Sequence, residues 1–353
     1  MDDIEYLSSG MRRIDDAILE LVGERLKISR KMGAAKAAAG EGMRDIVAER
    51  ATLDRFRALA DMIGLNPEAG EEFCRILLEQ SLSVQASAPR GPTEKKKIAI
   101  VGGQGQMGKM MLRLLGRAEH EMIVIDPVAK NGRSLADAAD ADVVIVSVPI
   151  SSVSGVLTGL DGICREDALI FDISSLKSPF IGVLTDMASR RRVCSVHPMF
   201  GPSVRSMHGR NLIVCDCGCP EAAEMAVGLM KDQGAEIKVI PVGEHDRYMS
   251  YVLGLSHIVN IAFFTVLERS GIPFPELCSV ASTTFDKMID TNMSVAMEDP
   301  KLYYEIQHLN VSRDMMLSEL GDAIHAVSDA AMSEGPEEFR DLMLRGRGYL
   351  EGQ

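Results

Sequence analysis

The sequence predicts a multidomain protein in three parts: an all-α segment, an α/β domain with a doubly wound, mainly parallel sheet, and a second all-α segment. Residues 1–85 have helical periodicity and no convincing strand. From Lys95, short apolar runs alternate with segments of helix length, which is typical of parallel strands joined by helices. From about His245 these runs stop, and long helical stretches continue to the end of the sequence.

The first segment is expected to form three helices. The first covers Met11 to Ala39, where apolar residues recur every three or four positions, and it would be about 40 Å long. Gly40-Glu41-Gly42 would end it. The second is predicted from Asp45 to Ile63. The third is predicted from Glu68 to Gln85, after the helix-start pair Asn66-Pro67.

Six strands are expected in the α/β domain, each a short apolar run. They are Lys97–Val101, Met122–Ile125, Val143–Val148, Ala168–Asp172, Val193–Val196 and Leu212–Cys215. A stretch rich in Ala, Ser, Pro and Gly precedes the first of them and has the composition of a linker. We therefore place a helical domain at residues 1–88, a linker at 89–96, the α/β domain at 97–243 and a last helical domain at 244–353.

The overall charge restricts the kinds of partner. The 353 residues carry a formal net charge of −13, which argues against general binding to nucleic-acid phosphates. Small anionic substrates remain compatible, because a local cluster of Arg and Lys can oppose the global field. No uninterrupted apolar run reaches the ~18 residues of a membrane-spanning helix, so no membrane segment is expected.

The N-terminus and the cysteines predict a cytoplasmic protein. Met1-Asp2-Asp3 is acidic and is not followed by the basic and apolar regions of a signal peptide. Seven scattered cysteines, an odd number, suit a reducing compartment. Cys215, Cys217 and Cys219 follow an apolar run and precede Pro220, so we interpret them as a strand entering a turn. No metal site is predicted there, because thiol ligands of zinc are usually spaced more widely.

A glycine-rich turn follows the first predicted strand. The pattern Gly103-x-Gly105-x-x-Gly108 lies between this strand and a predicted helix, as in a Rossmann dinucleotide-binding fold. Its glycines allow a tight turn and a close approach of backbone to a pyrophosphate, which the helix N-terminus faces. The predicted cofactor-binding residues of this turn are Gly103, Gly105, Gln106, Met107 and Gly108.

The ends of the next two predicted strands extend this site. Asp126 ends the second strand about twenty residues after the glycines, where a carboxylate accepts hydrogen bonds from a ribose 2′-hydroxyl and repels a 2′-phosphate. NAD is therefore favoured over NADP. Ser147, Val148 and Pro149 end the third strand and are predicted to contact the cofactor on its nicotinamide side.

Polar groups also follow two later strands. Asp172 to Lys177 includes Ser175, and His197 to Pro202 begins with a histidine. Ligands of open α/β sheets bind outside the carboxyl ends of the strands. A histidine there, ionising near neutral pH, can take the proton of an alcohol while hydride leaves the same carbon.

Several strings of residues resemble one enzyme family. Gly-Gly-Gln-Gly-Gln-Met-Gly at 102–108, Val-Ser-Val-Pro-Ile at 146–150, Ser-Ser-Leu-Lys at 174–177 and His-Pro-Met-Phe-Gly-Pro at 197–202 look like those of prephenate dehydrogenases. Glu244-His245-Asp246 resembles the start of that family's helical dimerisation domain. With the three-helix segment in front, the arrangement resembles the bifunctional chorismate mutase–prephenate dehydrogenases of tyrosine biosynthesis.

The resemblance implies a chemistry for the α/β part. His197 would accept the proton of the C4 hydroxyl of prephenate as hydride passes to NAD⁺, and Ser175 would hydrogen-bond that hydroxyl or His197 itself. His245 and His257 would line the substrate pocket. Loss of CO₂ would then make the ring aromatic and yield 4-hydroxyphenylpyruvate.

One position departs from this family. An Arg that grips a prephenate carboxylate usually lies five residues before an Asp-Pro pair, but Ser294 occupies that place before Asp299-Pro300. Losing a bidentate cation should weaken the binding of a dianion. Arg205 or Arg210, just after the His197 string, could replace it.

The three-helix segment resembles the all-helical chorismate mutases. Arg25 and Lys36 lie eleven residues apart, about three helical turns, so both project from one face. The resemblance implies that they contact a carboxylate and the breaking ether oxygen, where they stabilise the transition state. It also implies Asp45 and Glu49 around the C4 hydroxyl, and Ser81 and Gln85 on the third helix, with Gln85 donating to the ether oxygen.

This segment departs from its family as well. Ser8 stands where the family has an Arg that enters the partner subunit's site, and Ala48 stands where it has a second Arg. Arg12 or Arg13 could serve in place of the first. With two cations absent, the mutase activity could be reduced or lost.

Two alternative functions remain open, and a homodimer is expected. The chain could be an arogenate or cyclohexadienyl dehydrogenase with a vestigial helical domain, or that domain could serve only for dimerisation and for sensing tyrosine as an effector. A long first helix cannot bury its apolar stripe within about 85 residues, and the C-terminal helices also need a partner. We therefore expect an obligate homodimer that binds chorismate and prephenate.

Overall fold

In the computed structural model, the chain divides into two compact units. Unit 1 comprises Met1–Val148, Val153–Ile173 and Gly182–Ile240, and unit 2 comprises Pro149–Ser152, Ser174–Ile181 and Pro241–Gln353. The structure describes residues 2–39, 45–86, 94–116, 120–129, 132–204, 206–207, 209–231 and 234–352. Most of the predicted linker, residues 89–93, lies outside them.

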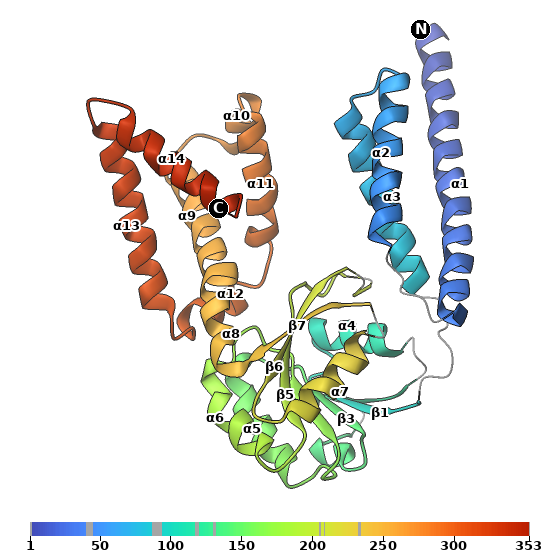
Figure 1. The fold of residues 1–353 in the computed structure, drawn as a ribbon, viewed down its shortest axis with the longest axis vertical. Coiled ribbons are helices and arrows are strands. Elements are labelled where there is room, and N and C mark those ends of the chain that lie inside the picture. Colours follow the sequence, from blue (N-terminus) through green and yellow to red (C-terminus); the bar gives the residue numbers. More distant parts are fainter. Residues whose placement is uncertain are drawn as a thin grey trace. The chain divides into compact units, whose positions relative to one another are not determined.

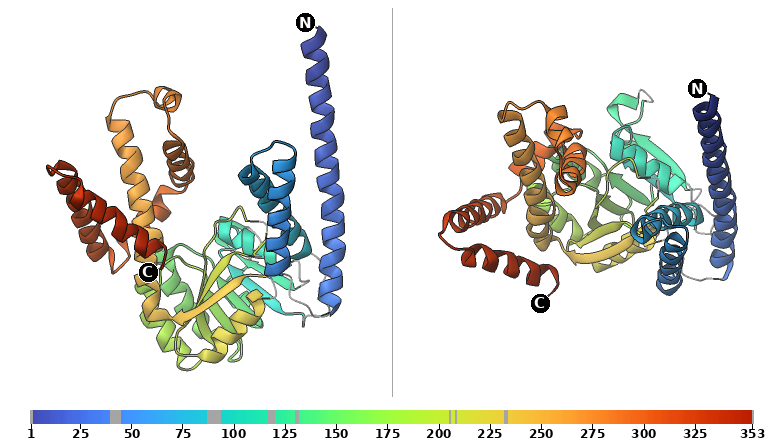
Figure 2. Two further views of the ribbon diagram at one scale, coloured as in Figure 1. Left: turned by 45° about the horizontal axis from the view of Figure 1, so that its top comes forward. Right: turned by 90° about the horizontal axis from the view of Figure 1, so that it is seen from above.

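The N-terminal segment forms three helices, as predicted: α1 (Asp2–Ala39), α2 (Ile46–Met62) and α3 (Pro67–Ala86). α1 begins at Asp2 and not at Met11, because nothing in that stretch breaks a helix and its single glycine is tolerated. Residues 3–9 and 11–20, in the N-terminal half of α1, are all exposed. Figures 1 and 2 show α1 as one long helix beside the shorter α2 and α3. Apolar side chains in that half, including Ile14 and Leu19, are exposed.

Small residues bring these helices together. A Cβ atom added to Gly33 of α1 would lie 2.7 Å from Gln85 Cα on α3, and one added to Gly70 of α3 would lie 2.5 Å from Ala60 Cβ on α2. Side chains larger than hydrogen at these two glycines would push the helices apart. The close approach of α1 and α3 sets the spacing of the polar residues that they carry.

The α/β part contains a seven-stranded sheet in the order β2-β1-β3-β4-β5-β6-β7 (Figure 1). The strands are β1 (Lys97–Val101), β2 (Glu121–Ile125), β3 (Val143–Val146), β4 (Leu169–Asp172), β5 (Val193–Pro198), β6 (Asn211–Asp216) and β7 (Glu236–Pro241). The first five are parallel, and β6 is antiparallel to β5. This confirms the predicted mainly parallel, doubly wound sheet.

Three details of the sheet differ from the prediction. β5 ends at Pro198 and not at Val196, so His197 lies within the strand and not after it. β3 ends at Val146 and not at Val148, although Ser147 N still donates to Val101 O, and Pro149 cannot continue the ladder. The prediction did not include β7, which is an edge strand with mostly exposed side chains and so lacks an apolar run.

The helices of the α/β part are α4 (Gln106–Leu115), α5 (Ile150–Asp161), α6 (Ile181–Ala188) and α7 (Pro220–Lys231). Side chains of α4 and α7, among them Met111 and Ala226, pack in one cluster with the strand residues Ile100 and Phe171. These four side chains are fully buried. The central strands are mainly apolar because helices cover them.

Unit 2 is helical after Pro241, as predicted. Its helices are α8 (Val242–Met249), the π-helical turn η5 (Ser250–Leu255), α9 (Ser256–Arg269), α10 (Phe274–Ser279), α11 (Thr283–Ala296), α12 (Pro300–His308), α13 (Arg313–Met332) and α14 (Glu337–Leu350). The division into units falls between Ile240 and Pro241, near the predicted boundary after residue 243. It also assigns to unit 2 two short segments that follow β3 and β4 in the chain.

α8, η5 and α9 form one continuous helix, Val242–Arg269. By length and composition alone it could cross a membrane, although only 17% of its most apolar window is buried. The sequence predicted helix here, but the criterion of an uninterrupted apolar run did not select this segment because polar residues interrupt it. A single helix of this kind is weak grounds for a membrane segment, since an apolar face that binds another subunit has the same composition.

Candidate active site and nucleotide-binding turn

The predicted glycine turn lies between β1 and the start of α4, in the geometry of a dinucleotide site. Gly102 has a φ of +82°, and its N–H donates to Ile125 O at 2.8 Å. A Cβ atom on Gly102 would overlap the Ser147 carbonyl, and one on Gly108 would overlap the Gly102 carbonyl. Gly105 caps α4 without a side chain, so the backbone N–H groups of Gln106 and Met107 open the helix. The turn therefore has the backbone shape that a pyrophosphate needs.

Asp126 lies beside this turn, directly after β2. Its carboxylate accepts hydrogen bonds from Gln104 N and Val128 N, both at 2.9 Å, and its side chain is buried. Ser147 N donates to Val101 O at 2.8 Å, which places the end of β3 next to the turn. Asp126, the end of β3 and the glycine turn, where an added Cβ would overlap the backbone, fit the adenosine and pyrophosphate half of a dinucleotide.

Val148 and Pro149 follow Ser147 where β3 ends. Ser147 and Val148 are half-buried and Pro149 is exposed. Their predicted cofactor contacts stay predictions.

His197 is the next to last residue of β5 and is 4% exposed. In the antiparallel pairing it faces Ile213 of β6. At the neighbouring strand end, Ser195 Oγ donates to the buried carboxylate of Asp172. His197 therefore lies at a carboxyl end of the parallel strands, which is where ligands of such sheets bind.

Arg113, which the sequence analysis did not single out, supports the loop after His197. Its Nη2 donates to Pro202 O at 2.9 Å and to Val204 O at 2.7 Å. Arg113 belongs to α4, so the helix that begins at the glycine turn also anchors this loop. No sequence pattern identifies such a contact, because the two segments are ninety residues apart.

A second group of predicted residues lies within unit 2. Ser175 is half-buried in the turn after β4, and His245 is fully buried on α8. The carboxylate of Asp246 joins these segments: it accepts from Lys177 N at 2.9 Å and Ser178 N at 2.7 Å, and it lies 2.6 Å from His245 Nδ1. Asp246 was not among the predicted site residues.

His257, also in unit 2, lies on α9. Its ring stacks on Tyr303 with 4.2 Å between centroids. Burial lowers the pKa of His257, so the ring favours its neutral form. Nδ1 is buried and has no hydrogen-bond partner among the described residues, so a bound ligand could satisfy it.

Three residues bear on the substrate-carboxylate contact that the family's Arg would make. Ser294 is exposed, and its Oγ donates to Thr291 O of its own helix at 2.7 Å. Arg210 is exposed just before β6, and Arg205 lies outside the described residues. The geometry therefore gives Ser294 no anion-binding role.

The helical segment brings together part of its predicted site. Arg25 Nη1 donates to Leu77 O at 2.8 Å and also to Ser81 Oγ. Ser81 and Gln85 are buried, and Gln85 Oε1 has no hydrogen-bond partner among the described residues. A bound polar ligand could satisfy this buried amide oxygen. Lys36 is half-buried on the C-terminal part of α1.

Asp45 and Glu49 begin α2. Asp45 is the N-cap of this helix and accepts from Ala48 N at 3.0 Å, so the structure gives it a capping role. Glu49 is half-buried one turn later. Ser8, Arg12, Arg13 and Ala48 are exposed.

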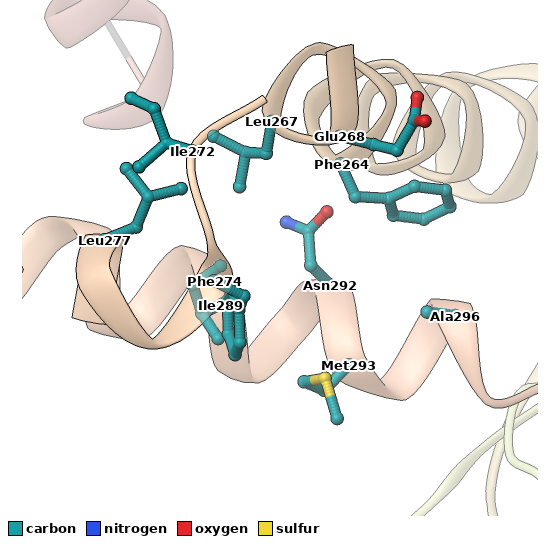
Figure 3. Close-up of a pocket in the computed structure, with 10 residues that line it drawn as sticks. All are labelled: Phe264, Leu267, Glu268, Ile272, Phe274, Leu277, Ile289, Asn292, Met293 and Ala296. Atoms are coloured by element: carbon teal, nitrogen blue, oxygen red, sulfur yellow. The ribbon is translucent and has the colours of Figure 1, made fainter. Parts of the chain in front are cut away.

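A separate pocket of about 370 Å³ lies between α9, α10 and α11 of unit 2 (Figure 3). Its walls are mainly apolar, including Phe264, Leu267 and Ile289. Only Asn292 and Glu268 are polar, and the amide of Asn292 points between the helices (Figure 3). Histidine and cysteine are absent from the pocket lining, and Glu268 is its one ionisable residue.

The fold and these sites define a class of protein: a nucleotide-binding α/β dehydrogenase joined to a three-helix domain and a C-terminal helical domain. Three family models match successive parts of the chain. Chorismate mutase type II matches residues 7–86, the nucleotide-binding domain of prephenate dehydrogenase matches 118–239, and the prephenate dehydrogenase dimerization domain matches 241–344. The second match begins after the glycine turn, so the assignment of that turn rests on its geometry.

Relatives span most of this chain. The T-protein of Enterobacter agglomerans is 27% identical over 311 residues, which are 86% of this chain and 81% of the relative. The T-protein of Haemophilus influenzae is 26% identical over 310 residues, 87% of this chain and 81% of the relative. Together, the chorismate mutase and prephenate dehydrogenase models and the T-protein relatives support the family of bifunctional chorismate mutase–prephenate dehydrogenases for this chain.

A solved structure supports the fold. The prephenate dehydrogenase from A. aeolicus, crystallised with hydroxyphenyl propionate and NAD⁺, is similar with a TM-score of 0.60 and 17% identity. The similarity covers 74% of this chain and 100% of that structure. At this identity it bears on the fold alone.

Proposed function

We propose that the chain catalyses two consecutive steps of tyrosine biosynthesis. The helical N-terminal domain rearranges chorismate to prephenate, and the rest of the chain oxidatively decarboxylates prephenate to 4-hydroxyphenylpyruvate with NAD. The observation that carries the second step is the glycine turn with Asp126 beside it, in a chain whose family models include both enzymes.

His197 is the proposed base of the dehydrogenase. An imidazole at the end of a buried strand has a fixed position and can accept the proton of the C4 hydroxyl. NAD, when bound, supplies the hydride acceptor. In unit 2, Ser175 is proposed to hydrogen-bond the substrate hydroxyl, and His245 and His257 to contact the substrate.

The proposed mutase site uses charge and not covalent chemistry. Breaking the ether bond of chorismate gathers negative charge on oxygen, which Lys36 and Gln85 would stabilise. Arg25, already positioned by Ser81, would bind a carboxylate. Glu49, with Asp45, would contact the C4 hydroxyl.

The substrate assignment is tested by assaying the purified protein with chorismate alone, and then with prephenate or arogenate plus NAD⁺ or NADP⁺. We expect prephenate formation from chorismate and NADH formation from prephenate. Faster oxidation of arogenate would favour the cyclohexadienyl alternative. Chorismate binding without turnover would favour a helical domain with only dimerisation and regulatory roles. Adding tyrosine to the same assays tests its proposed role as an effector.

The cofactor assignment is tested at Asp126. Asp126→Asn removes the negative charge next to the adenosine site but keeps the size of the side chain. We expect a higher Michaelis constant for NAD⁺ and weaker discrimination against NADP⁺, because a 2′-phosphate is no longer repelled. An unchanged ratio of kcat/KM values for NAD⁺ and NADP⁺ would refute the role of this carboxylate.

We also propose that the protein is a homodimer in the cytoplasm. The dimerization-domain match covers 241–344, and apolar side chains are exposed on α1 and along the helices of unit 2. A second subunit would cover these faces, including the apolar pocket between α9 and α11 (Figure 3). All seven cysteines are free thiols, which suits a reducing compartment. A monomer by light scattering at micromolar concentration, still active, would contradict the dimer.

A further inference from the structure

The Asp246 carboxylate accepts several hydrogen bonds in a buried position. Asp246 is 4% exposed. Lys177 N donates to both of its oxygens, at 2.9 and 3.1 Å, and Ser178 donates through its backbone N at 2.7 Å and through its Oγ. The other contact is His245 Nδ1, at 2.6 Å from Oδ1. One carboxylate thus binds the turn after β4 and the imidazole of α8 at the same time.

The chemistry of these partners favours the ionised carboxylate. Burial by itself would raise the pKa of Asp246, but hydrogen bonds from His245 and Ser178 outweigh it and hold the pKa below its ordinary value. An ionised carboxylate accepts hydrogen bonds and cannot donate one. His245 Nδ1 must therefore carry the proton in this contact.

The backbone around Asp246 is fixed from other directions. Asn310 Nδ2 donates to the Asp246 carbonyl at 3.4 Å, and Lys177 Nζ donates to Ser174 O at 2.7 Å. The turn carrying Ser175 is thus fastened at Ser174, Lys177 and Ser178. Burying a charge costs free energy. The benefit of a carboxylate at this place is that its hydrogen bonds fix the positions of the neighbouring groups.

We propose that Asp246 is a positioning residue of the dehydrogenase reaction, which holds the His245 ring with its proton on Nδ1 and keeps the Ser175 turn in register with that ring. The proposal rests on the proposed function, because it assigns both neighbours to the prephenate site. In a neutral ring with the proton on Nδ1, Nε2 becomes the acceptor. The carboxylate also fixes the ring plane, as the partner of a working imidazole commonly does.

The decisive variant is Asp246→Asn, which keeps the size of the side chain but loses the charge and one acceptor. We expect kcat/KM for prephenate to fall by about 10²-fold, the scale seen when the partner of a functional imidazole is lost. Chorismate turnover by the same chain should be unchanged and reports that the protein is folded. Asp299→Asn, which alters only a helix cap of the same unit, is the matched control and should keep both activities.

A second measurement separates positioning from mere stability. Nitrogen-15 NMR of the wild-type protein, with His245 assigned by the loss of its signals in His245→Gln, should show a protonated Nδ1. In Asp246→Asn the ring should shift toward the Nε2-protonated tautomer. A structural role alone predicts no change of tautomer.

These measurements test the role of Asp246 separately from the proposed dehydrogenase function. A neutral His245 protonated on Nε2 in the wild type overturns it, even where Asp246→Asn loses both activities by unfolding. A less than tenfold fall in kcat/KM for the folded variant also overturns it. Failure of the wild type to oxidise prephenate at all would instead reject the proposed function, while the tautomer would still report what Asp246 does.

Discussion

The two proposed sites differ in how deeply their residues are buried and in which elements position them. His197 and Asp126 lie at the ends of strands in a buried sheet and are themselves buried. In the helical segment, Lys36 and Glu49 are half-buried, Asp45 is exposed, and much of α1 is exposed. The core of the α/β part thus positions its site residues within one chain. The helical site instead depends on how a few helices meet, and a second subunit is expected to complete it.

This comparison predicts that the two activities respond independently to mutation, and the largest effect is expected at His197. His197→Ala should lower dehydrogenase kcat by about 10²–10⁴-fold, because a positioned general base is lost. Mutase turnover, measured on the same preparation, should stay within twofold of the wild type. Near-normal oxidation of prephenate would place the base elsewhere, with His245 or His257 as the next candidates.

The converse change is Lys36→Ala in the helical segment. It should lower mutase kcat by about 10²–10³-fold, since it removes a charge that faces the breaking ether bond. NADH formation from prephenate should be unaffected. Lys31→Ala, on an exposed face of the same helix, is the control. Loss of both activities in a folded Lys36→Ala protein would contradict the two-site assignment.

A smaller effect is expected at the glycine turn. Gly108→Ala places a Cβ against the Gly102 carbonyl, so the turn must shift and NAD⁺ binding should weaken by tenfold or more. Gly155→Ala on α5 meets no atom within 4 Å and should leave binding intact. Binding is measured by titration of the protein with NAD⁺. Equal affinity of the two variants would show that the turn does not hold the cofactor.

The smallest predicted effect concerns pH and His257. Burial lowers its pKa in the folded state, so between that value and the ordinary value of about 6.5 the unfolded chain binds more protons. The free energy of unfolding should therefore decrease as the pH falls below about 6.5, with no contribution from His257 above it. Urea unfolding between pH 5 and 8 measures this. His257→Gln should flatten the slope, and an equal slope would contradict the assignment.

Local patterns in the sequence predicted much of the fold and the cofactor site. Apolar runs predicted β1 and the central strands, because a strand covered on both faces is mostly apolar, and a shorter run predicted the edge strand β2. The spacing of Gly103, Gly105 and Gly108 predicted the turn, because the close approach of backbone there excludes side chains. These features depend on residues near one another in the chain, so one sequence is enough to identify them.

Contacts between segments that are distant in the sequence could be identified only from the tertiary structure. Asp246 reaches Lys177 and Ser178 from nearly seventy residues away, and Arg113 reaches the loop after His197 from about ninety. β7 has no apolar run because it lies at an edge, so only its pairing in the sheet defines it. The sequence by itself determined which residues can do the chemistry. The tertiary structure decided which groups hold them in place, because hydrogen bonds between distant segments leave no periodic pattern in the chain.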